Sequence, residues 1–338
     1  MSVSLGARPR TNAWLAPGLA GAVVFLLAAS VSIGSVPLAP FDAMSEALRG
    51  DSSTAALILS EIRLPRALLA ALVGATLGLA GAAMQGLLRN PLAEPGILGV
   101  SATAGLGAVI ALYFGLSQAF ALALPLGGMI GALFAVAVTY VLAGRDASIL
   151  TLILAGVALN AFAGALTSLA LNLAPSPYAA LEIVFWLLGS VADRSFNHIA
   201  VALPLMAVGW VLLAGTGRAL DALSLGEDVA RSLGVDLRLA RLRVILGTAL
   251  AVGAAVSVTG TIGFVGLVVP HLLRPLVGHE PSRLLLPSAF GGAALVLAAD
   301  IVARLVPLNS ELKLGVVTAI VGAPFFLYLI VHTRRTMR

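Results

Sequence analysis

The chain has 338 residues, of which 60% are hydrophobic and only 10% are charged, and its mean hydropathy is +1.06. This composition excludes a water-soluble protein with an apolar core and a charged shell, and it indicates a membrane protein. The 20 basic residues exceed the 15 acidic residues, an imbalance that membrane topology explains more simply than nucleic-acid binding does. The absence of cysteine excludes disulfides, thiolate metal sites and a cysteine nucleophile.

Apolar stretches long enough to cross a bilayer follow one another along the chain, since a spanning helix needs about 20 apolar residues. The first is longer than the apolar region of a signal peptide and more spans follow, so we interpret it as an uncleaved first helix. The stretches are residues 11–41, 67–88, 95–144, 147–181, 195–217, 244–273, 284–299 and 314–333.

Two of these stretches are expected to hold two helices each. Residues 95–144 are about twice as long as one span, and a turn fits near Gly115. Residues 244–273 divide in the same way if Gly260 and Gly263 mark a bend. We therefore predict one all-α membrane domain over residues 1–338, with about ten transmembrane helices and both termini in the cytoplasm. Pro91 and Pro95 predict a cytosolic turn, with Ala93 accessible from the cytosol.

Ten helices place 14 of the 20 basic residues on the cytoplasmic side, where Lys and Arg are preferred. Nine helices would instead put the C-terminal arginines outside. The 14 residues are Arg8, Arg10, Arg89, Arg145, Arg218, Arg231, Arg238, Arg241, Arg243, Arg274, Arg283, Arg334, Arg335 and Arg338. The six outside are Arg49, Arg63, Arg66, Arg194, Arg304 and Lys313.

No motif for covalent chemistry is present in the sequence. The single lysine, Lys313, does not lie in a phosphate-binding loop, so we do not expect the chain to hydrolyse ATP. The four histidines show no metal-ligand spacing, and there is no Gly-x-Ser-x-Gly elbow. Asp300 is the best candidate for a proton relay, but Arg304 follows four residues later, so an ion pair is favoured. We predict no catalytic residue, no metal site and no cofactor in this chain.

Residues 218–241 form the longest charged segment between two spans. Leu225, Val229 and Leu233 recur at a spacing of four residues, on one face of a short helix, and Gly226 and Gly234 allow sharp turns at its ends. This pattern predicts a small amphipathic helix at the cytosolic surface. Such a helix rests on lipid or fits a groove on a soluble partner, and the pattern alone favours neither.

Small residues recur at close spacing at Gly74, Gly78, Gly81 and Gly291–Gly292. In lipid, small residues let two helices approach closely, so these positions predict tight helix packing and no chemistry.

Several long motifs stand in order along nearly the whole chain. They are RLPR (63–66), LAGAAMQGLLRNPLAEPGILGVSATAG (79–105), LILAGVALN (152–160), FWLLGS (185–190), LGEDVARSLGV (225–235), GTIGFVGLVVPHLLR (260–274), AADIVAR (298–304) and GVVTAIVGAPFF (315–326). In these motifs the chain resembles the iron-siderophore, heme and vitamin B12 permeases of ABC importers, the FecCD family.

The resemblance implies ten helices per subunit, in a multi-pass protein of the bacterial inner membrane. It also implies a second permease subunit, with a homodimer preferred over a pair of similar permeases, two cytosolic ATPases that bind ATP and magnesium, and a periplasmic binding protein. One departure is Lys313, where relatives commonly have a proline before the Gly-Val-Val-Thr stretch.

The resemblance also assigns three groups of site residues. The pathway is expected along the helix of residues 148–171. The ATPase-coupling residues are Leu225, Gly226, Glu227, Val229, Ala230, Arg231, Leu233 and Gly234, with Glu227 and Arg231 facing solvent. The binding-protein docking residues are Arg63, Arg66 and Arg304, and the pathway or gate residues are Ser148, Thr151 and Asn160.

The three arginines at the outer face have two interpretations. A lone exposed arginine anchors a helix end at the headgroups, whereas several together are suited to grip carboxylates of a binding protein. We favour docking for the group, since the resemblance supports it.

The predicted function is ATP-driven import of an iron chelate by alternating access, with ferric siderophore first, heme second and cobalamin third. The alternative is a secondary transporter driven by an ion gradient, which predicts coupling acids inside the bundle.

Overall fold

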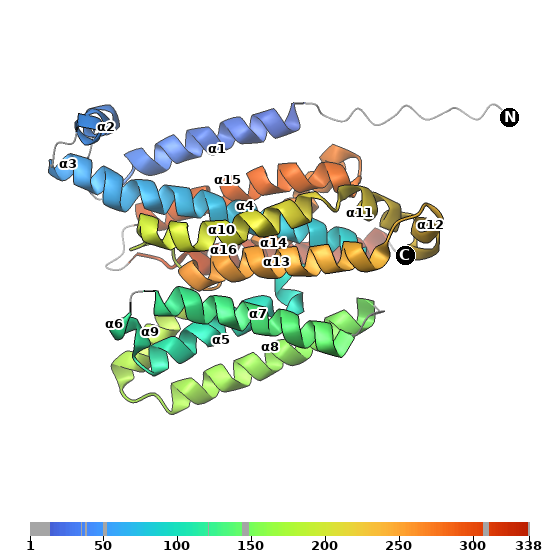
Figure 1. Cartoon of the computed structure of the whole chain (residues 1–338). Coiled ribbons are helices and arrows are strands. Elements are labelled where there is room, and N and C mark those ends of the chain that lie inside the picture. The colour runs from blue at the N-terminus through green and yellow to red at the C-terminus, as the bar shows by residue number, and fades with distance from the viewer. Residues whose placement is uncertain are drawn as a thin grey trace.

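The computed structural model describes residues 14–34, 36–37, 39–49, 53–120, 122–143, 149–306 and 311–336, and all the regular structure in them is helical. Long helices run side by side along one direction, while short helices lie at the two ends of the bundle (Figure 1). An all-helical polytopic membrane architecture is therefore confirmed.

Seven helical segments of the described residues are long and apolar enough to cross a membrane. They are α1 (Leu15–Ser32), the joined elements α3 (Thr54–Leu57), η1 (Ile58–Arg63) and α4 (Leu64–Leu88), then α7 (Ala123–Ala143), α8 (Ile149–Asn172), α10 (Phe196–Ala214), α13 (Leu237–Thr259) and α15 (Pro281–Leu305).

Shorter apolar helices complete the bundle, namely α5 (Val100–Tyr113), α9 (Pro177–Leu187), α14 (Val265–Leu273) with η3 (Arg274–Val277), and α16 (Leu314–Thr336), whose apolar part is short. The remaining elements are α2 (Pro40–Arg49), η2 (Pro95–Leu98), α6 (Leu116–Ala119), α11 (Gly217–Ser224) and α12 (Glu227–Ser232).

Both predicted divisions of long apolar stretches are present. Gly115 separates α5 from α6 and α7 with a φ of 65°, and Gly260 ends α13 with a φ of 73°, angles that glycine adopts without strain. At a rise of about 1.5 Å per residue, α14 is only about 14 Å long, less than half of a bilayer core of about 30 Å. The count of ten complete spans therefore stays a prediction.

Residues 147–181 do not form the single helix that the sequence predicted. The helix α8 ends at Asn172, and α9 begins at Pro177. The hydroxyl of Ser176 accepts a hydrogen bond from the Ala179 amide at 3.2 Å, and proline suits the first turn because it has no N–H to satisfy. Ser176 and Pro177 therefore start a new helix within a stretch that the sequence predicted as one span.

The core lies along α4 and α13, where 78% and 72% of the most apolar window is buried, against 6% in α1. The predicted close packing of small residues is confirmed between α4 and α15. A Cβ added to Gly74 would overlap the carbonyl of Gly292, and one added to Gly78 would overlap that of Ser288. Glycine is needed at these positions because the two backbones are in direct contact.

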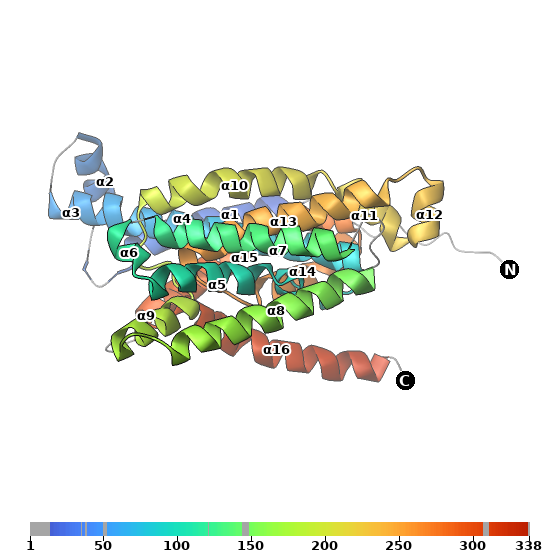
Figure 2. The ribbon, with the colours of Figure 1, turned by 60° about the horizontal axis from the view of Figure 1, so that its bottom comes forward.

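The two ends of the bundle differ. The helices α11 and α12 lie at one end, where α1 begins and α16 ends, while α2 and α3 lie at the other end (Figure 1 and Figure 2). This arrangement agrees with termini on the same side as the coupling segment. Of the basic residues assigned to that side, Arg8, Arg10, Arg145 and Arg338 lie outside the described residues.

The predicted turn at residues 90–95 is present, but the expected exposure of Ala93 is wrong. The Leu92 amide donates to the Asn90 side chain at 2.9 Å, and the Ala93 amide donates to the Asn90 carbonyl at 3.1 Å. The turn folded by these bonds leaves Ala93 fully buried, whereas Asn90 and Pro91 are exposed.

Candidate functional site

The predicted amphipathic helix is α12, together with the residues that flank it. Gly226 and Gly234 at its ends have φ values of 112° and 79°. The side chains of Leu225, Val229 and Leu233 are 65%, 43% and 63% exposed, although all three are apolar. Ala230, on the opposite face, is fully buried. The helix therefore presents an uncovered apolar face at the end of the bundle.

Arg241 fixes α12 in place, while Arg231 forms ion pairs within the helix. Arg241 of α13 forms a 2.7 Å ion pair with Glu227, and Arg231 pairs with Glu227 at 3.3 Å and with Asp228 at 3.0 Å. The expectation that Glu227 faces solvent is wrong in part, because its contact with Arg241 leaves the carboxylate side chain only 32% exposed. Arg231 is exposed as predicted. Glu227 thus joins the short helix to a buried helix of the core.

The arginines at the other end of the bundle are not exposed. Arg63 is 5% exposed and donates to the carbonyls of Val31 and Ser32, both at 2.9 Å, and to that of Val36. Arg304 donates to the carbonyls at the end of α1, including Ile33 at 2.8 Å. The last carbonyls of a helix have no partner within it, so these guanidinium groups cap α1.

A buried carboxylate joins two of these arginines. Asp300 pairs with Arg66 at 2.9 Å and with Arg304 at 3.0 Å, and its side chain is 2% exposed. The ion pair predicted between Asp300 and Arg304 is confirmed. Arg66 also pairs with Glu311 at 2.9 Å, and the Arg304 guanidinium donates to the Ser30 hydroxyl at 2.6 Å. No sequence motif marks these contacts, which join distant parts of the chain.

The predicted exposure of Arg63, Arg66 and Arg304 is therefore corrected, because groups of the same chain already bind all three guanidinium groups. A contact with a binding protein stays a prediction.

The predicted gate residues do not form one cluster. Thr151 and Asn160 lie on α8, about 14 Å apart along the helix at about 1.5 Å per residue, and Ser148 lies outside the described residues. The Asn160 amide donates to the Gly96 carbonyl at 3.0 Å, so it holds η2 against α8. The exposed face of α8 is apolar, with Leu154, Val157 and Phe162 each more than half exposed.

Lys313, the departure from the usual proline, stands directly before α16. Its ammonium lies 5.7 Å from the centre of the Phe185 ring of α9, within range of a cation–π contact. Among the described residues, no three His, Asp or Glu side chains are placed to hold a metal ion.

The bundle of apolar helices, with a charged segment at one end, defines a multi-pass membrane protein. The model of the FecCD transport family matches residues 22–332, and the chain belongs to this family. It is the permease subunit of an ABC importer of the bacterial inner membrane, and it is not itself an enzyme.

Relatives are similar over most of the chain. The vitamin B12 import system permease protein BtuC of Vibrio cholerae is 43% identical, over 89% of this chain and 88% of its own. The hemin transport system permease protein HmuU of Yersinia pestis is 37% identical, over 96% of this chain and 98% of its own. A solved structure described as an inward-facing metal-chelate type ABC transporter has a TM-score of 0.81 and 32% identity, covering 94% of this chain and 98% of its own.

Proposed function

We propose that this permease imports a ferric siderophore from the periplasm to the cytoplasm by alternating access, with heme as the second candidate and cobalamin as the third. Relatives named for vitamin B12 and for hemin are about equally similar, so identity does not rank the substrates. The preference for a siderophore over heme is supported by α8, whose sequence contains no His, Met, Tyr or Cys. Protein ligands of heme iron come from these residue types, so this helix offers heme no axial ligand.

An apolar wall suits transport of a bulky chelate. The exposed side chains of α8 give weak contacts and no fixed site, so a substrate can leave as easily as it enters. High affinity then belongs to the periplasmic binding protein. Two copies of this chain would enclose the pathway between them, with an ATPase below each copy biasing two packed states of the dimer.

The uncovered apolar face of α12 supports ATPase docking there. A groove on a partner would remove the exposed apolar surface of Leu225, Val229 and Leu233 from water. The Glu227–Arg241 ion pair would then transmit a displacement of α12 to α13. A helix in a groove is a recurrent way of binding an amphipathic segment.

The proposed docking of a binding protein on Arg63, Arg66 and Arg304 has to be changed, because these side chains are not exposed. Because Arg63 and Arg304 are occupied by α1, their proposed contribution is to hold the outer end of the bundle in shape. Glu311 is half exposed and is oriented by Arg66, so this pair is the part of the cluster that a binding protein can reach.

Vesicle uptake with the partner ATPase tests the proposal. Uptake of ferric siderophore should require ATP and exceed that of hemin and cobalamin, whereas ATP-independent uptake that an uncoupler stops would favour a secondary transporter.

Val229→Asp and Leu233→Asp should each weaken ATPase binding by orders of magnitude, because a buried unpaired charge costs several kcal/mol. Asp228→Asn, which removes a charge on the polar side of the same helix where the side chain is 98% exposed, is the matched control. Normal ATPase binding by both Val229→Asp and Leu233→Asp would show that α12 does not dock on the ATPase.

A further inference from the structure

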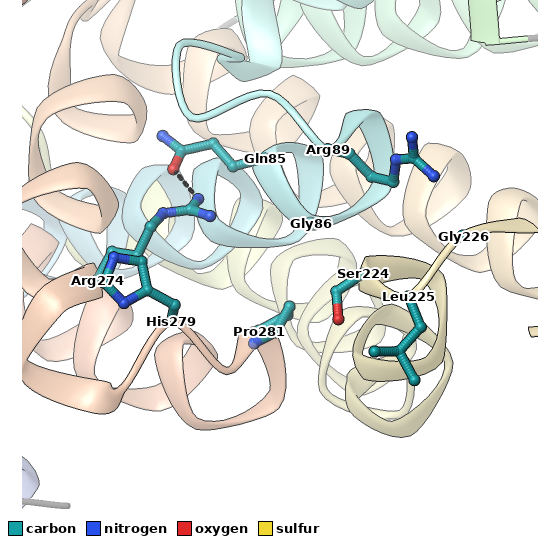
Figure 3. A pocket seen from close by; sticks show the side chains of 9 residues that line it. All are labelled: Gln85, Gly86, Arg89, Ser224, Leu225, Gly226, Arg274, His279 and Pro281. Atoms are coloured by element: carbon teal, nitrogen blue, oxygen red, sulfur yellow. Dashed lines mark hydrogen bonds between the residues drawn. The ribbon is translucent and has the colours of Figure 1, made fainter. Parts of the chain in front are cut away.

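A polar cavity of about 580 Å³ opens beside the coupling segment (Figure 3). Three separate parts of the chain build its wall: the end of α4, the connection from α11 to α12, and the segment from η3 to α15. They contribute Gln85 and Arg89, then Ser224 and Leu225, then Arg274 and His279. None of the nine residues that line the cavity is acidic.

The acidic side chains that stand nearest to the lining residues in the sequence contact other groups. Glu227 pairs with Arg231 and Arg241, and Asp228 pairs with Arg231. Asp221 accepts a hydrogen bond from the Ser282 amide at 2.8 Å, and Glu280 pairs with Arg283 at 2.5 Å. Among the described residues, none of these carboxylates forms an ion pair with Arg89 or Arg274.

The orientation of Arg274 is fixed by a buried glutamine. The Gln85 side-chain amide donates to the carbonyls of Gly266 and Leu267 at 3.4 and 3.2 Å, which turns its oxygen toward Arg274. That oxygen accepts from the Arg274 guanidinium at 2.6 Å, the bond drawn in Figure 3. The Nε of Arg274 is buried and has no hydrogen-bond partner. Because this atom is closed to solvent, it offers no donor to a ligand in the cavity, and Arg274 must act through the rest of its guanidinium group.

A lining with two arginines and no acidic residue suits an anion with several acceptor oxygens. A guanidinium binds phosphate through two parallel N–H donors, and an exposed second arginine, Arg89, stands on the same cavity. Lipid is the nearest source of phosphate. Leu272 and Leu276, which flank Arg274, are 54% and 46% exposed and apolar, as residues that contact acyl chains would be. Basic pockets at the cytoplasmic ends of membrane helices bind anionic headgroups.

We propose that this cavity binds the phosphate of an anionic phospholipid of the cytoplasmic leaflet. The headgroup would join α4, α15 and the start of the coupling segment, so lipid composition would set how firmly that segment is held. The proposal rests on the proposed orientation in the membrane, with α12 on the cytosolic side. It does not need α12 to dock on an ATPase, and each can fail without the other.

Native mass spectrometry of the detergent-purified permease tests this directly, with dioleoyl phosphatidylglycerol, dioleoyl phosphatidylcholine and inorganic phosphate as probes. The wild-type chain should prefer phosphatidylglycerol over phosphatidylcholine, and Arg274→Gln and Arg89→Gln should each bind phosphatidylglycerol at least about tenfold more weakly. Arg238→Gln is the matched control, because Arg238 is an exposed arginine at the start of α13 and does not line the cavity. Arg89 is exposed, so its variant remains informative if Arg274→Gln fails to fold.

Three outcomes would overturn the proposal. Equal binding of phosphatidylglycerol by the wild type and by Arg89→Gln and Arg274→Gln would place the lipid elsewhere. Binding of inorganic phosphate alone, with displacement of the lipid, would assign the cavity to a soluble phosphate compound. Release of the lipid on addition of the ATPase would show that the cavity belongs to the contact between the permease and the ATPase. An ATPase pull-down with the same variants separates this result from a failure of α12 docking.

Discussion

Replacement of Asp300 by asparagine tests the buried charge cluster at the outer end of the bundle. The change keeps the shape of the side chain but removes the charge that Arg66 and Arg304 share. Loss of one member of a buried pair costs about 3–5 kcal/mol, because the remaining charge is left unpaired. Arg66 retains Glu311, so we expect the lower half of this range. At about 2 °C per kcal/mol for a large chain, the unfolding midpoint should fall by about 6–8 °C.

The midpoint can be followed by size-exclusion chromatography of the detergent-solubilised protein after heating. Asp228→Asn is the control, because it removes the same type of aspartate–arginine pair where the carboxylate side chain is 98% exposed, and it should unfold at the wild-type temperature. An unchanged midpoint for Asp300→Asn would refute the structural role of the cluster. If this variant also lost uptake that an uncoupler had inhibited in the wild type, Asp300 would be a proton relay instead.

Gly78→Val should prevent the contact of α4 with the Ser288 carbonyl and cost at least about 1–3 kcal/mol, whereas Gly21→Val, with no atom within 4 Å, should leave the melting temperature unchanged. Equal melting temperatures for the two variants would contradict the packing argument. Because the chain has no native cysteine, an impermeant thiol reagent should label Asn90→Cys from the cytosolic side. It should label Leu116→Cys, at the exposed start of the short helix α6, from the periplasmic side. Labelling of both from the same side would overturn the topology.

Local features of the fold could be predicted from the sequence because their causes are local. Gly115 and Gly260 divide apolar stretches since each takes a backbone angle that other residues avoid. Asp300 and Arg304 meet because a helix brings residues four apart onto one face. Gly74 and Gly78 could be assigned to packing because small residues have that use in lipid, but the partner helix could not be named.

The contacts missed by the sequence analysis join residues that are distant along the chain. Arg66 and Asp300 are 234 positions apart, and no spacing rule connects them. The interpretation of Arg63 as exposed failed for a related reason, since its partners are backbone carbonyls, which every residue carries and no motif marks. The cavity at Arg274 likewise needs three segments that only the folded chain brings together.

The capping of α1 has a consequence for the order in which the protein assembles. A nascent chain emerges from its N-terminus, so α1 enters the membrane long before Arg304, which lies 271 positions after Ile33. Arg63 can cap the Val31 and Ser32 carbonyls early, but through most of synthesis the carbonyls of Ser30 and Ile33 have only water and lipid headgroups as partners. The helix α1 can stay in the membrane without these contacts, because its surface is apolar and little of it is buried against other helices. The capping of α1 is thus only partial at first, and α15 must be in the membrane before the outer end of the bundle can close.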